Sequence, residues 1–188
     1  MSANDIRVGN VLEHSNRLFV VNKPPEHTKP GKGGAFVQVE MSDIVSGTKI
    51  YERFRSTETV TKARLDETNM NFLYQEGEML LLMNNETFEQ QEIPLGHLGD
   101  DLPMVQEGME LTLRLHEENI ISVSLPDSAV YKIKEADPVI KGQTATASYK
   151  PAVLENGVKV MVPPFVSSDD NIVVKIADRS YVERAKDA

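Results

Sequence analysis

Residues 152–162 read Ala-Val-Leu-Glu-Asn-Gly-Val-Lys-Val-Met-Val, and this stretch carries the pattern that decides the fold. Val158, Val160 and Val162 recur at every second position, which predicts a strand with one face in a core. Asn156-Gly157 stands between two apolar runs, and Asn-Gly in that setting is a strong signal for a tight turn. The stretch therefore predicts a β-hairpin.

The same period of two recurs along the chain, and long amphipathic helices are not evident. Arg17–Asn22 is a further strand candidate, and Asn84-Asn85 predicts a second hairpin between Leu80–Met83 and Thr87–Gln90. Helix is expected at most as one turn over Met104–Met109. Short strands this closely spaced predict an all-β protein of small barrels. The alternating triplets are Val37, Val39 and Met41; Leu111, Leu113 and Leu115; and Ile121, Val123 and Leu125.

Charge is distributed unevenly and suggests three domains, 1–65, 66–127 and 128–188. The first segment has 10 Lys/Arg and 7 Asp/Glu (net +3), and the last has 9 and 8 (net +1). The middle segment has only Arg114 against 14 acids (net −13), and the three values sum to the chain's −9. One interpretation is a solvated acidic face; the other is a molecule whose ends contact nucleic acid while its middle contacts solvent or a basic protein.

Composition limits the chemistry available to the 188 residues. The absence of Cys excludes disulfides, thiolate metal sites and a cysteine nucleophile. The four histidines lack metal-ligand spacing, so we expect neither a metal nor a cofactor. No apolar run is long enough to span a membrane and Met1–Asn10 does not resemble a secretory signal, so we expect a soluble, cytoplasmic and monomeric protein.

Residues 29–34, Lys-Pro-Gly-Lys-Gly-Gly, predict a bare loop with one cation at its tip. Pro30 stiffens the approach, while Gly31, Gly33 and Gly34 let another molecule come close to the backbone. Lys32 is followed by Gly33 and by an alternating segment, not by Ser/Thr and a helix, so this is not a nucleotide-binding P-loop. A lysine can settle among RNA phosphates without demanding one geometry, which favours a sequence-independent RNA contact.

Three motifs in order resemble bacterial elongation factor P over the whole chain. They are Lys29-Pro-Gly-Lys-Gly33, Met83-Asn-Asn-Glu-Thr-Phe-Glu-Gln90 and Lys150–Pro163. The resemblance implies an N-terminal SH3-like (KOW-like) barrel and two OB-folds in an L-shaped, tRNA-like arrangement. It also implies a non-enzymatic translation factor that binds both ribosomal subunits beside peptidyl-tRNA and relieves stalling at consecutive prolines.

The resemblance also implies roles for individual residues. Lys32 is expected to approach the acceptor end of the tRNA, flanked by Lys29, Pro30, Gly31, Gly33 and Gly34, and to be extended by a lysine-modifying enzyme, by lysylation or a hydroxylated group. Gly142-Gln143-Thr144 is the expected loop at the mRNA codon of the exit site, where the family commonly has Gly-Asp-Thr. Arg179 and Tyr181 are expected to contact the anticodon arm or small subunit, and Asp169 stands where the family signature has Gly.

Two other interpretations remain open at this stage. A paralogue resembling elongation factor P usually has Arg at the loop tip, and Lys32 favours the main factor. A general OB-fold binder of single strands stacks bases on aromatic side chains, whereas this chain has 6 Phe and 5 Tyr spread along it.

Overall fold

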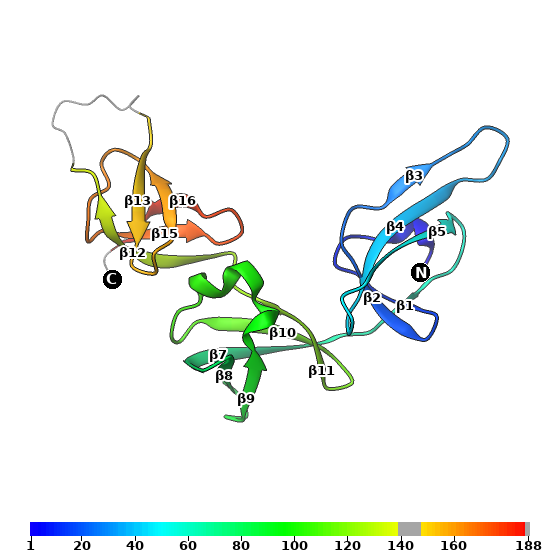
Figure 1. Cartoon of the computed structure of the whole chain (residues 1–188), viewed down its shortest axis with the longest axis horizontal. Coiled ribbons are helices and arrows are strands. Elements are labelled where there is room, and N and C mark those ends of the chain that lie inside the picture. Colours follow the sequence, from blue (N-terminus) through cyan, green and yellow to red (C-terminus); the bar gives the residue numbers. More distant parts are fainter. Residues whose placement is uncertain (139–147, 187–188) are drawn as a thin grey trace. The chain divides into compact units, whose positions relative to one another are not determined.

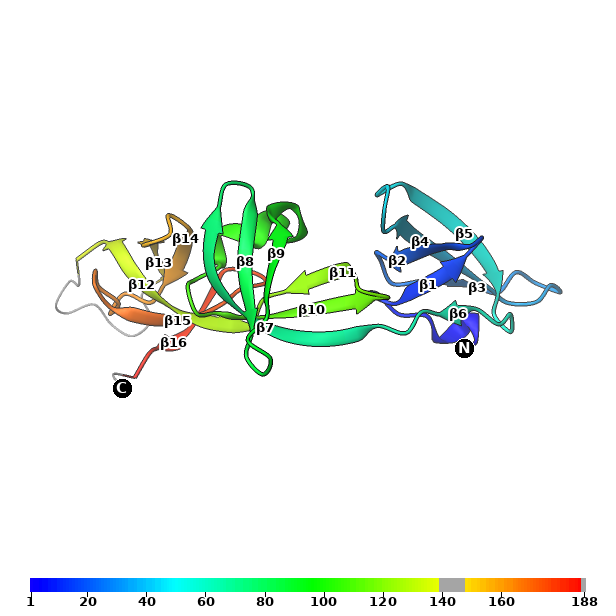
Figure 2. The same ribbon diagram turned by 90° about the horizontal axis from the view of Figure 1, so that it is seen from below.

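A computed structural model describes residues 1–138 and 148–186, and these residues form three β-sheets (Figures 1 and 2). The chain divides into two compact units. One unit is Met1–Asp66 with Leu115–Ile121, and the other is Glu67–Arg114 with Ser122–Ala188. The predicted domain boundaries at 65 and 127 stay predictions.

The first sheet has six strands in the order β3-β4-β2-β1-β6, with β5 also paired to β4. Val37, Val39 and Met41 on β4 are fully buried, which confirms the predicted alternation of that strand. The 3-10 helix η1 (Ala3–Asp5) contributes the fully buried Ala3 to the same core. The strands are β1 (Val11–His14), β2 (Arg17–Val21), β3 (Glu26–Thr28), β4 (Phe36–Asp43), β5 (Lys49–Arg55) and β6 (Thr61–Lys62).

The second sheet has the order β11-β10-β7-β8-β9. Leu111 and Leu113 are fully buried as predicted, whereas β11 is half-buried along most of its length and ends before Leu125. Its elements are β7 (Asp66–Glu76), β8 (Met79–Asn84), β9 (Gln90–Pro94), the 3-10 helices η2 (Leu95–His97) and η3 (Gly99–Met104), β10 (Glu110–His116) and β11 (Asn119–Ser124).

The hairpin predicted at Asn84-Asn85 is confirmed, because β8 pairs antiparallel with β9. Its second strand begins at Gln90 and not at Thr87, because the Asn84 side chain accepts hydrogen bonds from the backbone of Glu86 (2.8 Å) and Thr87 (3.1 Å) and so folds residues 85–89 into the turn. The helical turn is η3 and not Met104–Met109. It ends at the fully buried Met104, and Val105 returns to an extended backbone.

The third sheet has the order β14-β13-β12-β15-β16. The hairpin predicted at Asn156-Gly157 is confirmed: β13 pairs antiparallel with β14, with Ala152 opposite Val160. Within the same compact unit, the buried Tyr131 donates its hydroxyl to the Met104 carbonyl at 2.6 Å and so ties β12 to η3. The strands are β12 (Ser128–Ala136), β13 (Lys150–Leu154), β14 (Lys159–Val162), β15 (Asn171–Lys175) and β16 (Ser180–Arg184).

Candidate nucleic-acid interface

The Lys32 loop, residues 29–35, joins β3 to β4 and ends a two-stranded arm (Figure 1). The connecting turn is short because β3 pairs with β4 directly before it, with His27 opposite Val37. Every residue from 29 to 34 is exposed, so the loop contributes nothing to the core.

One hydrogen bond and one glycine conformation shape the tip. Gly33 donates its backbone N–H to the Pro30 carbonyl at 3.0 Å, and Gly31 has φ +34°, in the left-handed region that glycine adopts at low cost. Gly31 and Lys32 therefore form the turn, and the Lys32 ammonium stands at its apex on a stem of four methylenes.

Cations line the strand that supports the arm. Lys49, Arg53 and Arg55 on β5 are exposed on one face, because they alternate with the more buried Ile50, Glu52 and Phe54. The Arg53 guanidinium lies 4.0 Å from the centre of the Phe36 ring, at the point where β4 leaves the loop. That geometry is a cation–π contact, which holds a planar donor group at the base of the arm.

An ion pair lies where the chain enters the arm. The Lys23 Nζ donates to the Glu40 carboxylate at 2.8 Å, and the Glu40 side chain is only 8% exposed. The hydrogen bond from Lys23 is the main reason that the pKa of Glu40 lies below its ordinary value; burial opposes it. The same bond raises the pKa of Lys23. Both groups are therefore charged at neutral pH.

Sequence reasoning did not identify the Glu40 pair. Val39 and Met41 point into the core, so alternation places Glu40 on the solvent face of β4. It is buried nonetheless, because Lys23 and the cross-strand neighbour Tyr51 cover it. The Lys23–Glu40 contact joins a connecting segment to the middle of a later strand. Such a contact leaves no periodic pattern in the sequence.

Arg179 and Tyr181, two other predicted site residues, lie in or near the third sheet. Gly142, Gln143 and Thr144 lie outside the described residues. Tyr181 packs edge-to-face on Tyr149 with ring centres 6.3 Å apart, and partial burial is the main reason that its pKa is raised. Arg179 is engaged inside its own unit, donating to the Asp100 carbonyl and the Asp101 carboxylate, each at 2.9 Å.

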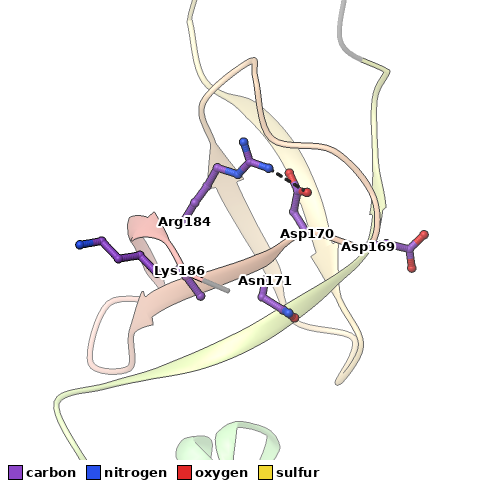
Figure 3. A pocket seen from close by; sticks show the side chains of 6 residues that line it. Asp169, Asp170, Asn171, Arg184 and Lys186 are labelled. Atoms are coloured by element: carbon purple, nitrogen blue, oxygen red, sulfur yellow. Dashed lines mark hydrogen bonds and ion pairs between the residues drawn. The ribbon is translucent and has the colours of Figure 1, made fainter. Parts of the chain in front are cut away.

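The third sheet also carries a polar hollow of about 380 Å³, lined by residues 169–171 where β15 begins and by residues 184–186 where β16 ends (Figure 3). Arg184 pairs with the Asp170 carboxylate at 3.2 Å, and Asp170 also accepts from the Ser167 backbone at 3.0 Å. Asp169 points away from this pair and lies 3.3 Å from Lys132. These carboxylates are matched by neighbouring donors, as in a structural cluster, so we place no catalysis here.

Two absences hold for the described residues. No three or more His or acidic side chains converge in a way that could hold a metal ion. Within the same ranges, 1–138 and 148–186, the helices are too short to cross a bilayer. The site therefore presents one ammonium group, that of Lys32, at the end of the β3–β4 arm.

Comparison with known proteins assigns the family. Three sequence profiles match consecutive segments: an elongation factor P KOW-like domain over residues 2–60, an elongation factor P OB domain over 65–123, and an elongation factor P C-terminal domain over 130–184. The chain belongs to the elongation factor P family. Its members act as translation elongation factors, which work with the ribosome and tRNA, and the predicted all-β class with KOW-like and OB domains is confirmed.

Curated relatives agree over the full length. Elongation factor P of Bartonella bacilliformis is 48% identical over 187 residues, which cover 100% of this chain and 98% of that protein. Elongation factor P of Chelativorans sp. is 49% identical over 185 residues, with 98% of each chain covered. The solved translation initiation factor 5A from Methanococcus jannaschii has a TM-score of 0.51 at 19% identity, covering 67% of this chain and 90% of that one, which shows a shared fold.

Proposed function

We propose that this member of the elongation factor P family binds beside peptidyl-tRNA and relieves stalling at consecutive prolines through Lys32. The observation that carries the proposal is the arm itself. Six consecutive exposed residues, 29–34, end in a turn whose apex is a lysine, and they make no contribution to the core. Lys29 and the other residues of the turn would then line the tRNA acceptor end.

The proposed mechanism is positional. Proline is a hindered nucleophile in a fixed ring, so misalignment of the peptidyl-tRNA is costly. A cation that settles among the phosphates and 2′-hydroxyls of the acceptor end restricts its motion, and orientation alone can lower a barrier by several kcal/mol. The chain itself transfers no proton and forms no covalent intermediate in this scheme. It is a ligand of the ribosome and not an enzyme.

Lys32 replacement tests the proposal in a reconstituted translation system. Lys32→Ala should slow synthesis of a consecutive-proline reporter to near the rate without factor, while a reporter without prolines is unchanged. Lys62→Ala is the matched control, since Lys62 is also exposed and lies on β6 of the same sheet. Equal reporter rates for wild type and Lys32→Ala would remove the proposal.

Extension of Lys32 by a modifying enzyme is part of the same proposal. An exposed apex is accessible to an enzyme, and a longer side chain would reach further into a crowded site. Mass spectrometry of the loop peptide from native cells should show added mass on Lys32 and none on Lys29. An unmodified loop peptide in native cells would refute this part alone.

A further inference from the structure

The chain passes from β2 to the arm along one edge of β4. β2 and β3 both pair with the same strand: β2 with the Met41–Asp43 end of β4 and β3 with the Phe36–Gln38 end. Residues 22–25 connect them along that edge. Pro24 and Pro25 have no backbone N–H to donate, so ladder hydrogen bonds cannot bridge the gap there.

The hydrogen-bond donors of Asn22 and Lys23, directly before the two prolines, all bond to acceptors on β4. The Asn22 backbone N–H donates to the Glu40 carbonyl at 3.0 Å, and its side chain donates to the Ser42 hydroxyl at 2.7 Å. Lys23 adds the 2.8 Å bond to the Glu40 carboxylate. These three bonds make a tether that fixes where the chain begins its path toward the loop.

Beyond this tether β3 has little to hold it. It is three residues long, all three are exposed, and it pairs with β4 through Glu26, His27 and Thr28. The other strand of the arm is better supported, because β5 pairs with β4 along its length from Phe36 to Ser42 and Arg53 covers Phe36. The direction of β3 therefore depends on how firmly residues 22 and 23 are attached.

We propose that Lys23 and Glu40 are positioning residues, whose ion pair sets the direction of the arm and thereby places Lys32. This inference rests on the proposed function of Lys32. From Lys23 to Thr28 the β3 side of the arm runs five residues, about 16 Å, so a rotation of about 10° at the tether moves the start of the loop by about 3 Å. Misplacement of a reacting group by about 1 Å can cost about a hundredfold in rate.

Glu40 is suited to this task because its carboxylate is buried. A surface ion pair exchanges partners easily and holds geometry weakly. A carboxylate that is only 8% exposed has lost most of its hydration, and this loss is uncompensated unless Lys23 remains bound, so the ammonium is held in one place. Lys23 is itself 67% exposed, and its replacement leaves the core undisturbed.

The chain supplies a matched control at the other end of β4. Asp43 is 2% exposed and pairs with Arg17, which is 57% exposed, at 2.7 Å. This pair has the same construction, an exposed cation on a buried carboxylate, but it lies at the β2 end of the strand and away from the arm. Its loss should affect stability and not the placement of Lys32.

The test measures the rate of proline–proline bond formation against factor concentration on purified ribosomes. Lys23→Met and Glu40→Gln should each lower the maximal rate about threefold or more at an unchanged half-saturating concentration, because placement and not docking is affected. Lys23→Met/Glu40→Gln should be no slower than either single variant, since the two act as one pair. Lys23→Arg should recover most of the rate.

Hydrogen exchange separates positioning from general destabilisation. The β3 amides should exchange faster in Lys23→Met than in Arg17→Met, and Arg17→Met should keep the wild-type maximal rate. Equal rate losses in the two variants, or an unchanged rate and unchanged β3 exchange in Lys23→Met, would overturn the inference. A Lys32→Ala variant without effect in the same assay would instead overturn the proposed function.

Discussion

Arg179 Nη2 lies 2.9 Å from Asp101 Oδ1 and joins the turn before β16 to helix η3, across 78 residues of sequence. The same guanidinium donates to the carbonyls of Asp100 and Ile176, and its side chain is 24% exposed. The family resemblance predicts that Arg179 contacts the anticodon arm or the small subunit, and that role stays a prediction. Any such contact must compete with these internal bonds.

A double-mutant cycle measures the strength of this link. Arg179→Ala and Asp101→Ala should each destabilise the protein, and their coupling should be about 1 kcal/mol, at the upper end for a partly exposed pair. Arg179→Lys should recover little, because an ammonium cannot reach two acceptors with a planar fork. Urea unfolding supplies the free energies. Additive losses would show that the two side chains are not coupled in solution.

Tyr131 gives η3 a second link, this time to β12, and the stability that it contributes should depend on pH in the alkaline range. Burial raises the pKa of Tyr131 to about 12, above the ordinary value of 10.0. The folded state therefore favours the neutral phenol. This contribution to stability is complete below pH 10 and is lost as the pH rises from about 10 to about 12.

Tyr131→Phe should lower the free energy of unfolding at pH 7 by about 1 kcal/mol, because the Met104 carbonyl loses its 2.6 Å donor. The variant should also lose less stability than wild type between pH 10 and 12. Thermal unfolding across that range checks both statements. Parallel pH curves for the two proteins would contradict the assignment of the shift to Tyr131.

The sequence predicted the elements whose signals are local. Alternation located the buried face of β4, and Asn156-Gly157 located the turn between β13 and β14. Lys32 was recognisable because glycines and a proline surround it. The errors came where side-chain hydrogen bonds override propensity, as when Asn84 captures the backbone of the next residues and delays the start of β9.

The supports of the site could not be read from sequence for another reason. The Lys23–Glu40 pair and the Arg53–Phe36 contact join segments separated by 17 residues along the chain. Each depends on strand register and on which exposed side chain bends over its neighbour. Periodicity identifies faces of strands, but it does not say which charged groups on a face will be covered.

Asp169, at the position where the family resemblance implies Gly, has a left-handed backbone conformation. Its φ is +69°, and its N–H donates to the Ile133 carbonyl at 2.9 Å, beside a bulge in β12. Glycine adopts this region freely, and Asp is among the few other residues that tolerate it. The position therefore has a conformation that suits glycine and that aspartate also tolerates.

Asp169→Gly should change the free energy of unfolding by less than about 1 kcal/mol, because relief of the left-handed conformation is offset by a more flexible unfolded chain. Asp169→Val should cost roughly 1–2 kcal/mol or more, since a branched side chain is poorly accommodated at this φ. Chemical denaturation of the two variants checks the order. A valine variant as stable as wild type would mean that the turn rearranges.

Alanine variants of the Lys32 loop should distinguish a glycine that the backbone conformation requires from a glycine that leaves room for another molecule. Gly31 has a positive φ, whereas a Cβ added at Gly34 meets no atom within 4 Å and that residue has no left-handed φ. Gly31→Ala should therefore strain the turn by about 1 kcal/mol. Gly34→Ala should leave the free protein unchanged in fold and stability.

The same variant tests close approach of another molecule. If that molecule contacts the backbone at Gly34, Gly34→Ala should stimulate proline–proline bond formation less than wild type. Full activity of Gly34→Ala, with unaltered loop exchange, would show that nothing comes within a methyl group's distance of the loop on that side.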